Sequence, residues 1–99
     1  QENFIVFYLN TQNKVIEAEA LFKGGLNACL MDIKTLFKNA LIKNSNSLII
    51  AHNHPSGNLS PSDEDLRIKE AIAKAGDLLS LNLLDFIIFN KVNYYCISD

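Results

Sequence analysis

The sequence predicts a single α/β domain with a mixed sheet and helices packed on it, in the order βββαβαββ. Two observations point to this class. Segments rich in β-branched and aromatic residues begin and end the chain, and two segments with apolar residues at helical spacing lie between them. The 99 residues are 48% hydrophobic and 20% charged, which is ordinary for a folded chain with one modest core.

The first two predicted strands form a hairpin. Phe4–Leu9 is apolar on both of its alternating faces, as in a central strand covered on both sides, and the asparagine-rich segment 10–14 is typical of a turn. Val15–Phe22 follows as the partner strand, with Glu17 and Glu19 on a face that we expect to be solvated. The other face of this strand is apolar and carries Ile16, Ala18, Ala20 and Phe22.

A third short strand is predicted over residues 26–30, after the pair Gly24-Gly25. Asp32 has the residue type of an N-cap, so a helix is expected to begin there and to run to about Lys43. Its apolar stripe consists of Ile33, Leu36, Phe37, Ala40 and Leu41.

Residues 47–51 read as a short buried strand, and the second helix is expected to open at Ser62. Asp65, three residues on, completes a variant of the capping box, and Gly76 is taken to mark the end of this helix. The apolar stripe consists of Ile68, Ile72, Ala75 and Leu79. The chain is then predicted to finish as a hairpin of strands 83–89 and 92–97 that turns at Asn90-Lys91.

Charge and composition exclude several classes of protein. The net charge of −2 and the pI near 5.6 disfavour direct nucleic-acid binding, which normally needs a basic excess. No apolar stretch approaches the roughly 20 residues of a membrane span, and no leader-like segment is seen, so we expect a cytoplasmic domain with Cys29 and Cys96 as reduced thiols. Because Gln1 is not an initiator methionine, residues 1–99 are interpreted as one domain, truncated at its N-terminus, of a longer protein.

The segment between the buried strand and the second helix holds both histidines. Alternate residues of an extended chain point the same way, so His52 and His54 present two imidazoles to one side. Asp65 is in helical register with the apolar stripe, and a buried carboxylate needs a partner or a metal ion. Two histidines and one carboxylate leave a fourth position open, as in a catalytic zinc site, and the same set suits non-haem iron. A polar loop followed by a capped helix remains the alternative.

The spacing of these residues resembles a known motif. His52-x-His54, seven residues, Ser62, two residues and Asp65 resemble the JAMM motif of MPN-domain metalloproteases. The amino-acid sequences of His52–Gly57 and Pro61–Asp65 are similar to those of one branch, the bacterial RadC family, which has long been associated with DNA repair. The similarity extends over essentially the whole chain, and it implies a JAMM/MPN-like fold of the cytidine-deaminase-like type.

The resemblance also implies roles for individual residues. His52, His54 and Asp65 would bind one zinc ion, with iron as the less favoured metal. Glu2 would be the general acid/base, taking a proton from the attacking water and delivering it to the leaving amine. Ser62 would help to hold the tetrahedral intermediate.

The leading hypothesis is a zinc-dependent metallohydrolase that cleaves amide or isopeptide bonds in a peptide substrate. The alternative is a non-catalytic protein-interaction module of a protein associated with DNA repair. Nucleobase deamination is disfavoured, because the sequence lacks the His-x-Glu and Cys-x-x-Cys signature of that chemistry.

Overall fold

A computed structural model describes residues 3–23 and 26–97 of the chain. Its five strands form one sheet with the order β2-β1-β3-β4-β5. The elements are β1 (Asn3–Leu9), β2 (Val15–Lys23), α1 (Leu26–Ile42), β3 (Ser47–Asn53), α2 (Asp63–Leu79), β4 (Asn82–Phe89) and β5 (Tyr94–Cys96). The order ββαβαββ confirms an α/β fold with a mixed sheet.

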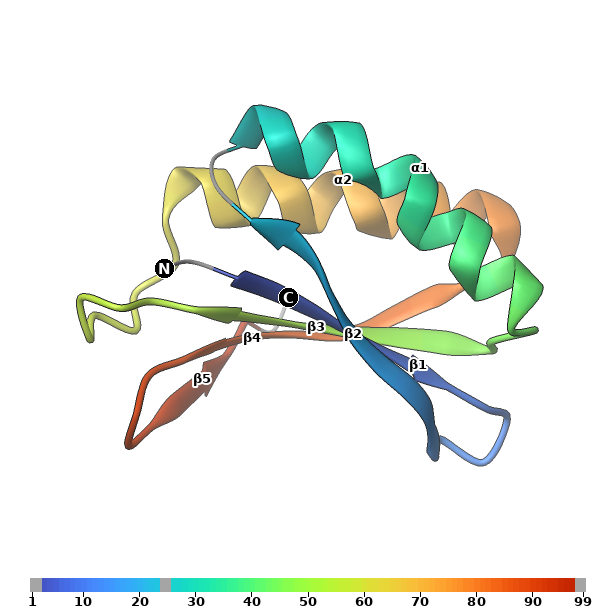
Figure 1. The fold of residues 1–99 in the computed structure, drawn as a ribbon, viewed down its shortest axis with the longest axis horizontal. Helices are drawn as coiled ribbons and strands as arrows, with labels where there is room; N and C mark the ends of the chain where they lie inside the picture. The colour runs from blue at the N-terminus through green and yellow to red at the C-terminus, as the bar shows by residue number, and fades with distance from the viewer. Residues whose placement is uncertain (1–2, 24–25, 98–99) are drawn as a thin grey trace.

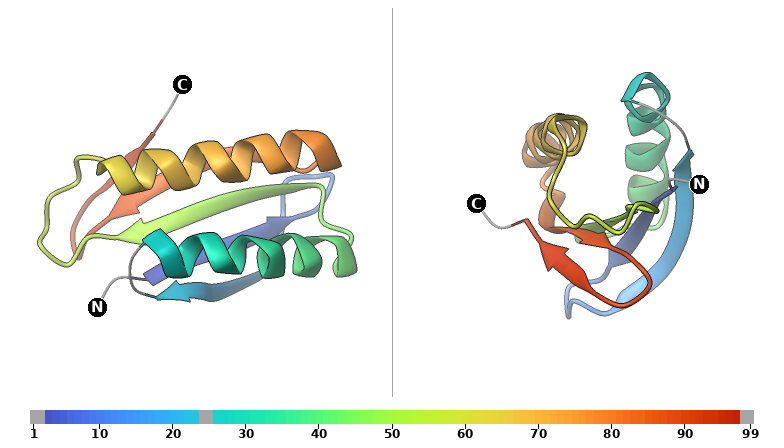
Figure 2. Two further views of the ribbon diagram at one scale, coloured as in Figure 1. Left: turned by 90° about the horizontal axis from the view of Figure 1, so that it is seen from above. Right: turned by 90° about the vertical axis from the view of Figure 1, so that its left-hand side faces the viewer.

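The sheet is mixed because β3 and β4 are parallel, while every other neighbouring pair is antiparallel. Helix α2 is the crossover that connects the two parallel strands, as such a pair requires. Both helices lie on the same face of the sheet (Figure 1), and the view along the layers in Figure 2 shows them side by side above it. The core lies between the helices and this face and includes Val6, Tyr8, Leu36, Ile50, Ile68, Ile72, Phe86 and Ile88.

The predicted third strand is wrong, because residues 26–30 form the first turns of α1. Leu26–Leu30 contains no β-branched residue, and its leucines and alanine favour a helix. Asp32 therefore lies inside the helix and is not its N-cap. The C-terminal end was expected near Lys43, and α1 ends at Ile42.

The glutamates of β2 lie on the face of the sheet that the helices cover, whereas the sequence predicted that this face is solvated. Pairing of β1 with β2 places Glu17 opposite Tyr8 and Glu19 opposite Val6, on the face that carries the helices. Glu19 is half-buried there and accepts hydrogen bonds from Tyr8 Oη at 2.5 Å and from Asn39 Nδ2 at 2.8 Å. The prediction of a solvated glutamate face is thus wrong for Glu19, because the buried hydroxyl of Tyr8 requires an acceptor.

The apolar face of β2 points away from the helices. Ile16 is 44% exposed, and Ala18 and Ala20 are also exposed. They share this face with the half-buried Ile5 and Phe7 of the neighbouring strand. Within the described part of the chain, no helix packs on this face of the sheet (Figure 2).

Helix α2 does not end at Gly76 but continues to Leu79, and Ser80 follows as its C-cap in the left-handed region with φ 58°. The backbone turns back so closely that Leu81 N–H donates to the Gly76 carbonyl at 2.7 Å. A Cβ atom at position 76 would lie 2.2 Å from Leu81 O, so only glycine fits without a backbone shift.

The C-terminal hairpin is confirmed, with a turn at Asn90–Asn93 and a final strand of only three residues. In the described ranges, neither helix is long and apolar enough to traverse a lipid bilayer. Cys96 is a free thiol, whereas the side chain of Cys29 lies outside the described part of the structure.

Candidate metal centre

The two histidines lie where strand β3 ends. His52 is the penultimate residue of β3, and His54 is the first residue beyond it. Pairing of β3 with β1 places Phe4 opposite His52, and the two rings stack with centroids 3.8 Å apart and planes inclined by 11°. His52 is 4% exposed, so its orientation is set by packing in the core.

Asp65 reaches both histidines from the first turn of α2. Its Oδ1 lies 2.5 Å from His52 Nδ1, and its Oδ2 lies 2.9 Å from His54 Nε2. Candidate ligand atoms of the three residues all lie within 4.8 Å of one another. Ligands about 2 Å from a tetrahedral ion are a little over 3 Å apart, so three such atoms can surround one metal ion. The structure thus brings together the three residues that the sequence singled out.

The environment of Asp65 keeps this carboxylate ionised. The side chain is fully buried, and burial by itself raises the pKa of a carboxyl group. Hydrogen bonds with His52 and with Ser62 outweigh that effect and lower the pKa of Asp65 to about 2. A buried negative charge therefore faces the two imidazoles at neutral pH.

Ser62 is the N-cap of α2, as predicted. Its Oγ accepts from Asp65 N–H at 3.1 Å, and Asp65 Oδ2 accepts from Ser62 N–H at 2.9 Å. This capping box fixes the start of α2 and orients the carboxylate at the same time. Asp65 thus stabilises the helix terminus with the same oxygen that approaches His54.

The tautomer of His54 follows from the contact of its Nδ1 with the backbone of Asn58. Nδ1 lies 2.6 Å from the carbonyl oxygen of Asn58, which can only accept, so Nδ1 carries the proton. In the neutral ring, Nε2 is then an acceptor that faces another acceptor, Asp65 Oδ2. A cation, either a proton or a metal ion, is required at this point. A backbone carbonyl that orients a histidine in this way is a common second contact of metal ligands.

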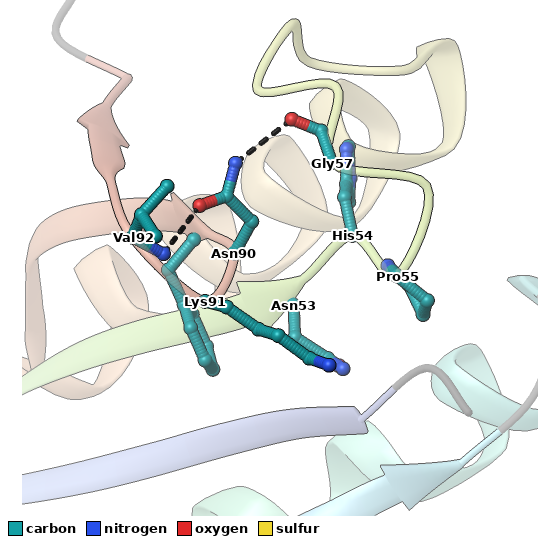
Figure 3. A pocket seen from close by; sticks show the side chains of 8 residues that line it. Asn53, His54, Pro55, Gly57, Asn90, Lys91 and Val92 are labelled. Carbon is teal, nitrogen blue, oxygen red and sulfur yellow. Dashed lines mark hydrogen bonds between the residues drawn. The ribbon is translucent and has the colours of Figure 1, made fainter.

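A network of hydrogen bonds shapes the loop that follows His54. His54 N–H donates to Phe89 O at 2.9 Å, and Gly57 N–H donates to His54 O at 2.9 Å. Gly57 has φ +89°, a conformation that glycine adopts without strain. Asn90 Nδ2 donates to Gly57 O at 2.8 Å, which ties this loop to the β4–β5 turn (Figure 3).

Residues of this loop line two hollows. The first has a volume of about 660 Å³ and is drawn in Figure 3. It is lined by Asn53, His54, Pro55, Gly57, Phe89, Asn90, Lys91 and Val92. The second, of about 430 Å³, is lined by His54, Pro55, Ser56, Ser62 and Glu64. His54 and Pro55 line both, so one residue of the triad borders two concave surfaces.

Glu2, the predicted general acid/base, lies outside the described residues. Glu19 makes its contacts with Tyr8 and Asn39, and Glu17 pairs with Lys43 at 3.5 Å. The structure adds residues that the sequence reasoning missed at the site, namely Phe4, Asn58 and Asn90. No periodicity identifies them, since their contacts depend on how separate segments meet.

These features define the class of protein as an α/β domain with a candidate His–His–Asp metal site at a strand-to-helix junction. Comparison with known families agrees, since the RadC-like JAB domain matches residues 1–99. The chain belongs to this family. It is 42% identical over all 99 residues to UPF0758 protein lin1584 of Listeria innocua, and 40% identical to a UPF0758 protein of Methanosarcina acetivorans. The chain covers 44% and 43% of these proteins, so it spans less than half of their length.

A further relative, UPF0758 protein ABC2615 of Shouchella clausii, is 48% identical over 88 residues. That match includes 89% of this chain and 38% of the relative.

Proposed function

We propose that this domain is a metal-dependent hydrolase of amide or isopeptide bonds. The observation that carries the proposal is the convergence of His52, His54 and Asp65. His54 also lines two hollows. Three protein ligands leave a coordination position for water or substrate, which distinguishes a catalytic site from a closed structural one. Membership of the RadC-like JAB family supports this reading.

Zinc is the metal that we propose, because two imidazoles and one carboxylate are a common catalytic zinc set. Non-haem iron uses the same donors and is the second choice. The metal, when bound, supplies a Lewis acid that lowers the pKa of a water molecule and polarises the substrate carbonyl. The ionised Asp65 and the Nδ1–H tautomer of His54 both suit a divalent cation.

Ser62 is proposed to stabilise negative charge on the substrate oxygen. A hydroxyl has one hydrogen and two acceptor lone pairs. Because Ser62 Oγ accepts from Asp65 N–H, its hydrogen can still be donated outward, and Ser62 lines the second hollow next to His54. Preorganised donors of this kind stabilise developing charge most effectively.

Glu2 is proposed as the general acid/base, as in the JAMM motif. Phe4, two residues later in the chain, stacks on His52, so the start of β1 adjoins the triad. The role proposed for the Glu2 carboxylate is to take a proton from the attacking water and pass it to the leaving amine.

The test combines metal analysis with a screen of peptide and isopeptide libraries on the full-length protein. We expect one equivalent of zinc in the wild type, little in His52→Ala and Asp65→Asn, and unchanged zinc in the remote control Lys14→Ala. Glu2→Gln should keep zinc and lose hydrolysis. If no divalent metal binds and His52→Ala changes nothing measurable, the hydrolase proposal is wrong and an interaction module becomes the better reading.

A further inference from the structure

The two hollows that His54 lines differ in charge. Lys91 is the only fully charged side chain among the residues that line the first hollow, and Glu64 is the only one among those that line the second. Within the described part of the chain, neither forms an ion pair. Each hollow therefore presents one charge that a ligand can neutralise.

The walls of the first hollow suit a side chain with an apolar stem. Phe89, Val92 and Pro55 supply apolar surface, and Lys91 lies on the β4–β5 turn, opposite residues of the loop that follows β3 (Figure 3). Asn90 lines the same hollow, but its amide is already engaged with Gly57, Val92 and Asn93. The ammonium group of Lys91 is thus the charged group of this lining that can attract an anionic ligand.

The second hollow is built from different groups. Its lining includes the hydroxyl residues Ser56 and Ser62 beside the exposed carboxylate of Glu64. A carboxylate attracts a cationic side chain or the amine of a lysine. Since His54 and Pro55 belong to both linings, an extended chain that crosses from one hollow to the other passes His54, one of the three triad residues.

We propose that the two hollows hold the substrate on either side of the scissile bond, with an acidic residue in the Lys91 hollow and a basic residue in the Glu64 hollow. This assignment rests on the proposed hydrolase function and specifies its substrate class. The substrate is a peptide or isopeptide whose cleaved bond lies between an acidic and a basic segment. Lys91 and Glu64 act as specificity determinants and take no part in bond cleavage.

Binding of short peptides tests this without hydrolysis. The probes are a fluorescein-labelled peptide with an acidic half and a basic half, the same peptide with its charge order reversed, and a version with glutamine at every charged position. Their dissociation constants are measured by anisotropy, with zinc and with chelator. We expect one charge order to bind more tightly than the other two peptides. Amide shifts on titration of ¹⁵N-labelled protein should fall at Lys91, Val92 and Glu64.

Charge-reversal variants then assign each hollow. Lys91→Glu and Glu64→Lys should each weaken binding of the preferred peptide by about two- to five-fold, the range for an exposed ion pair. The double variant should prefer the reversed peptide. Lys14→Glu is the matched control, because Lys14 carries the same charge in the β1–β2 turn, at the other end of the sheet.

The proposal is overturned if Lys91→Glu weakens binding no more than Lys14→Glu, or if all three peptides bind equally. Failure of the hydrolase proposal is a separate result. A protein that binds peptides in the Lys91- and Glu64-dependent manner but cleaves none of them refutes the hydrolase function and leaves the two binding sites intact. Cleavage that is indifferent to both charge reversals refutes only the specificity assignment.

Discussion

Asn90 offers the most selective way to perturb the candidate site from a distance. Its Nδ2 donates to Gly57 O at 2.8 Å, and its Oδ1 accepts from Val92 N–H and Asn93 N–H, both at 2.8 Å. Replacement of Asn90 by aspartate keeps the Oδ1 that accepts the two hydrogen bonds of the turn. It replaces Nδ2, the donor, by an oxygen that faces the Gly57 carbonyl. Asn90→Asp therefore breaks the tie to the His54 loop while it preserves the β4–β5 turn.

The expected magnitudes follow from these contacts. The lost hydrogen bond is worth roughly 0.5–1.5 kcal/mol, and repulsion between two oxygens brings the total to about 1–3 kcal/mol. For a domain of this size each kcal/mol lowers the melting temperature by about 4–8 °C. Asn58 O, which orients His54, lies next to Gly57, so a loosened loop should weaken zinc binding by about 10- to 100-fold.

The assay is zinc competition against a chromophoric chelator, with melting followed by circular dichroism in the absence of metal. Asn93→Asp is the control, because it introduces the same charge in the same turn, and the Asn93 side chain makes no hydrogen bond within the described residues. If Asn90→Asp binds zinc as tightly as Asn93→Asp does, Asn90 does not position the metal ligands.

Three other predictions concern single side chains. Zinc at 100 times its dissociation constant should stabilise the wild type by about 2.7 kcal/mol, or very roughly 10–20 °C, and Asp65→Asn should lose most of this shift in a thermal melt; equal shifts would exclude Asp65 as a ligand. Burial raises the pKa of Glu19, but hydrogen bonds from Tyr8 and Asn39 lower it by a larger amount. The pKa of Glu19 in the folded protein is therefore below its ordinary value. Because the unfolded chain binds the proton of Glu19 more tightly, the ionised carboxylate stabilises the folded state at neutral pH. This stabilisation is lost as the pH falls below about 4. The advantage of the wild type over Glu19→Gln in urea denaturation should shrink between pH 7 and pH 3.5, and a constant difference would contradict the mechanism. Gly76→Ala should destabilise the domain by about 1–3 kcal/mol, since its Cβ would meet a backbone oxygen; a variant as stable as the wild type in the same assay would show that the backbone yields.

The candidate metal ligands could be predicted from local patterns alone. Alternation along a strand places His52 and His54 on one side, and helical phase places Asp65 with Ile68 and Ile72, which are indeed fully buried in the same helix. The capping box of Ser62 and Asp65 is likewise a relation between residues three positions apart. Each of these signals spans only a few residues, so the covalent geometry of the chain is enough to reveal it.

The errors arose where local patterns allow two outcomes. Alternation in β2 separates Glu17 and Glu19 from Ile16 and Ala18, but it does not say which face the helices cover. Packing decided this, because Tyr8 is buried on the helix side and requires the Glu19 carboxylate. The short apolar segment 26–30 likewise suits a strand or a helix, and it is the start of α1.

The sequence by itself determined the α/β class, most of the element order, and the three side chains of the candidate metal centre. Tertiary structure alone decided the contacts that shape the site, such as Phe4 with His52 and Asn90 with Gly57, which join residues 48 and 33 positions apart. It also decided which face of the sheet is covered, and it placed the charges of Lys91 and Glu64 in two different hollows that His54 lines. The physical reason is that periodicity reports the geometry within one element, whereas the meeting of two elements depends on how the whole core packs.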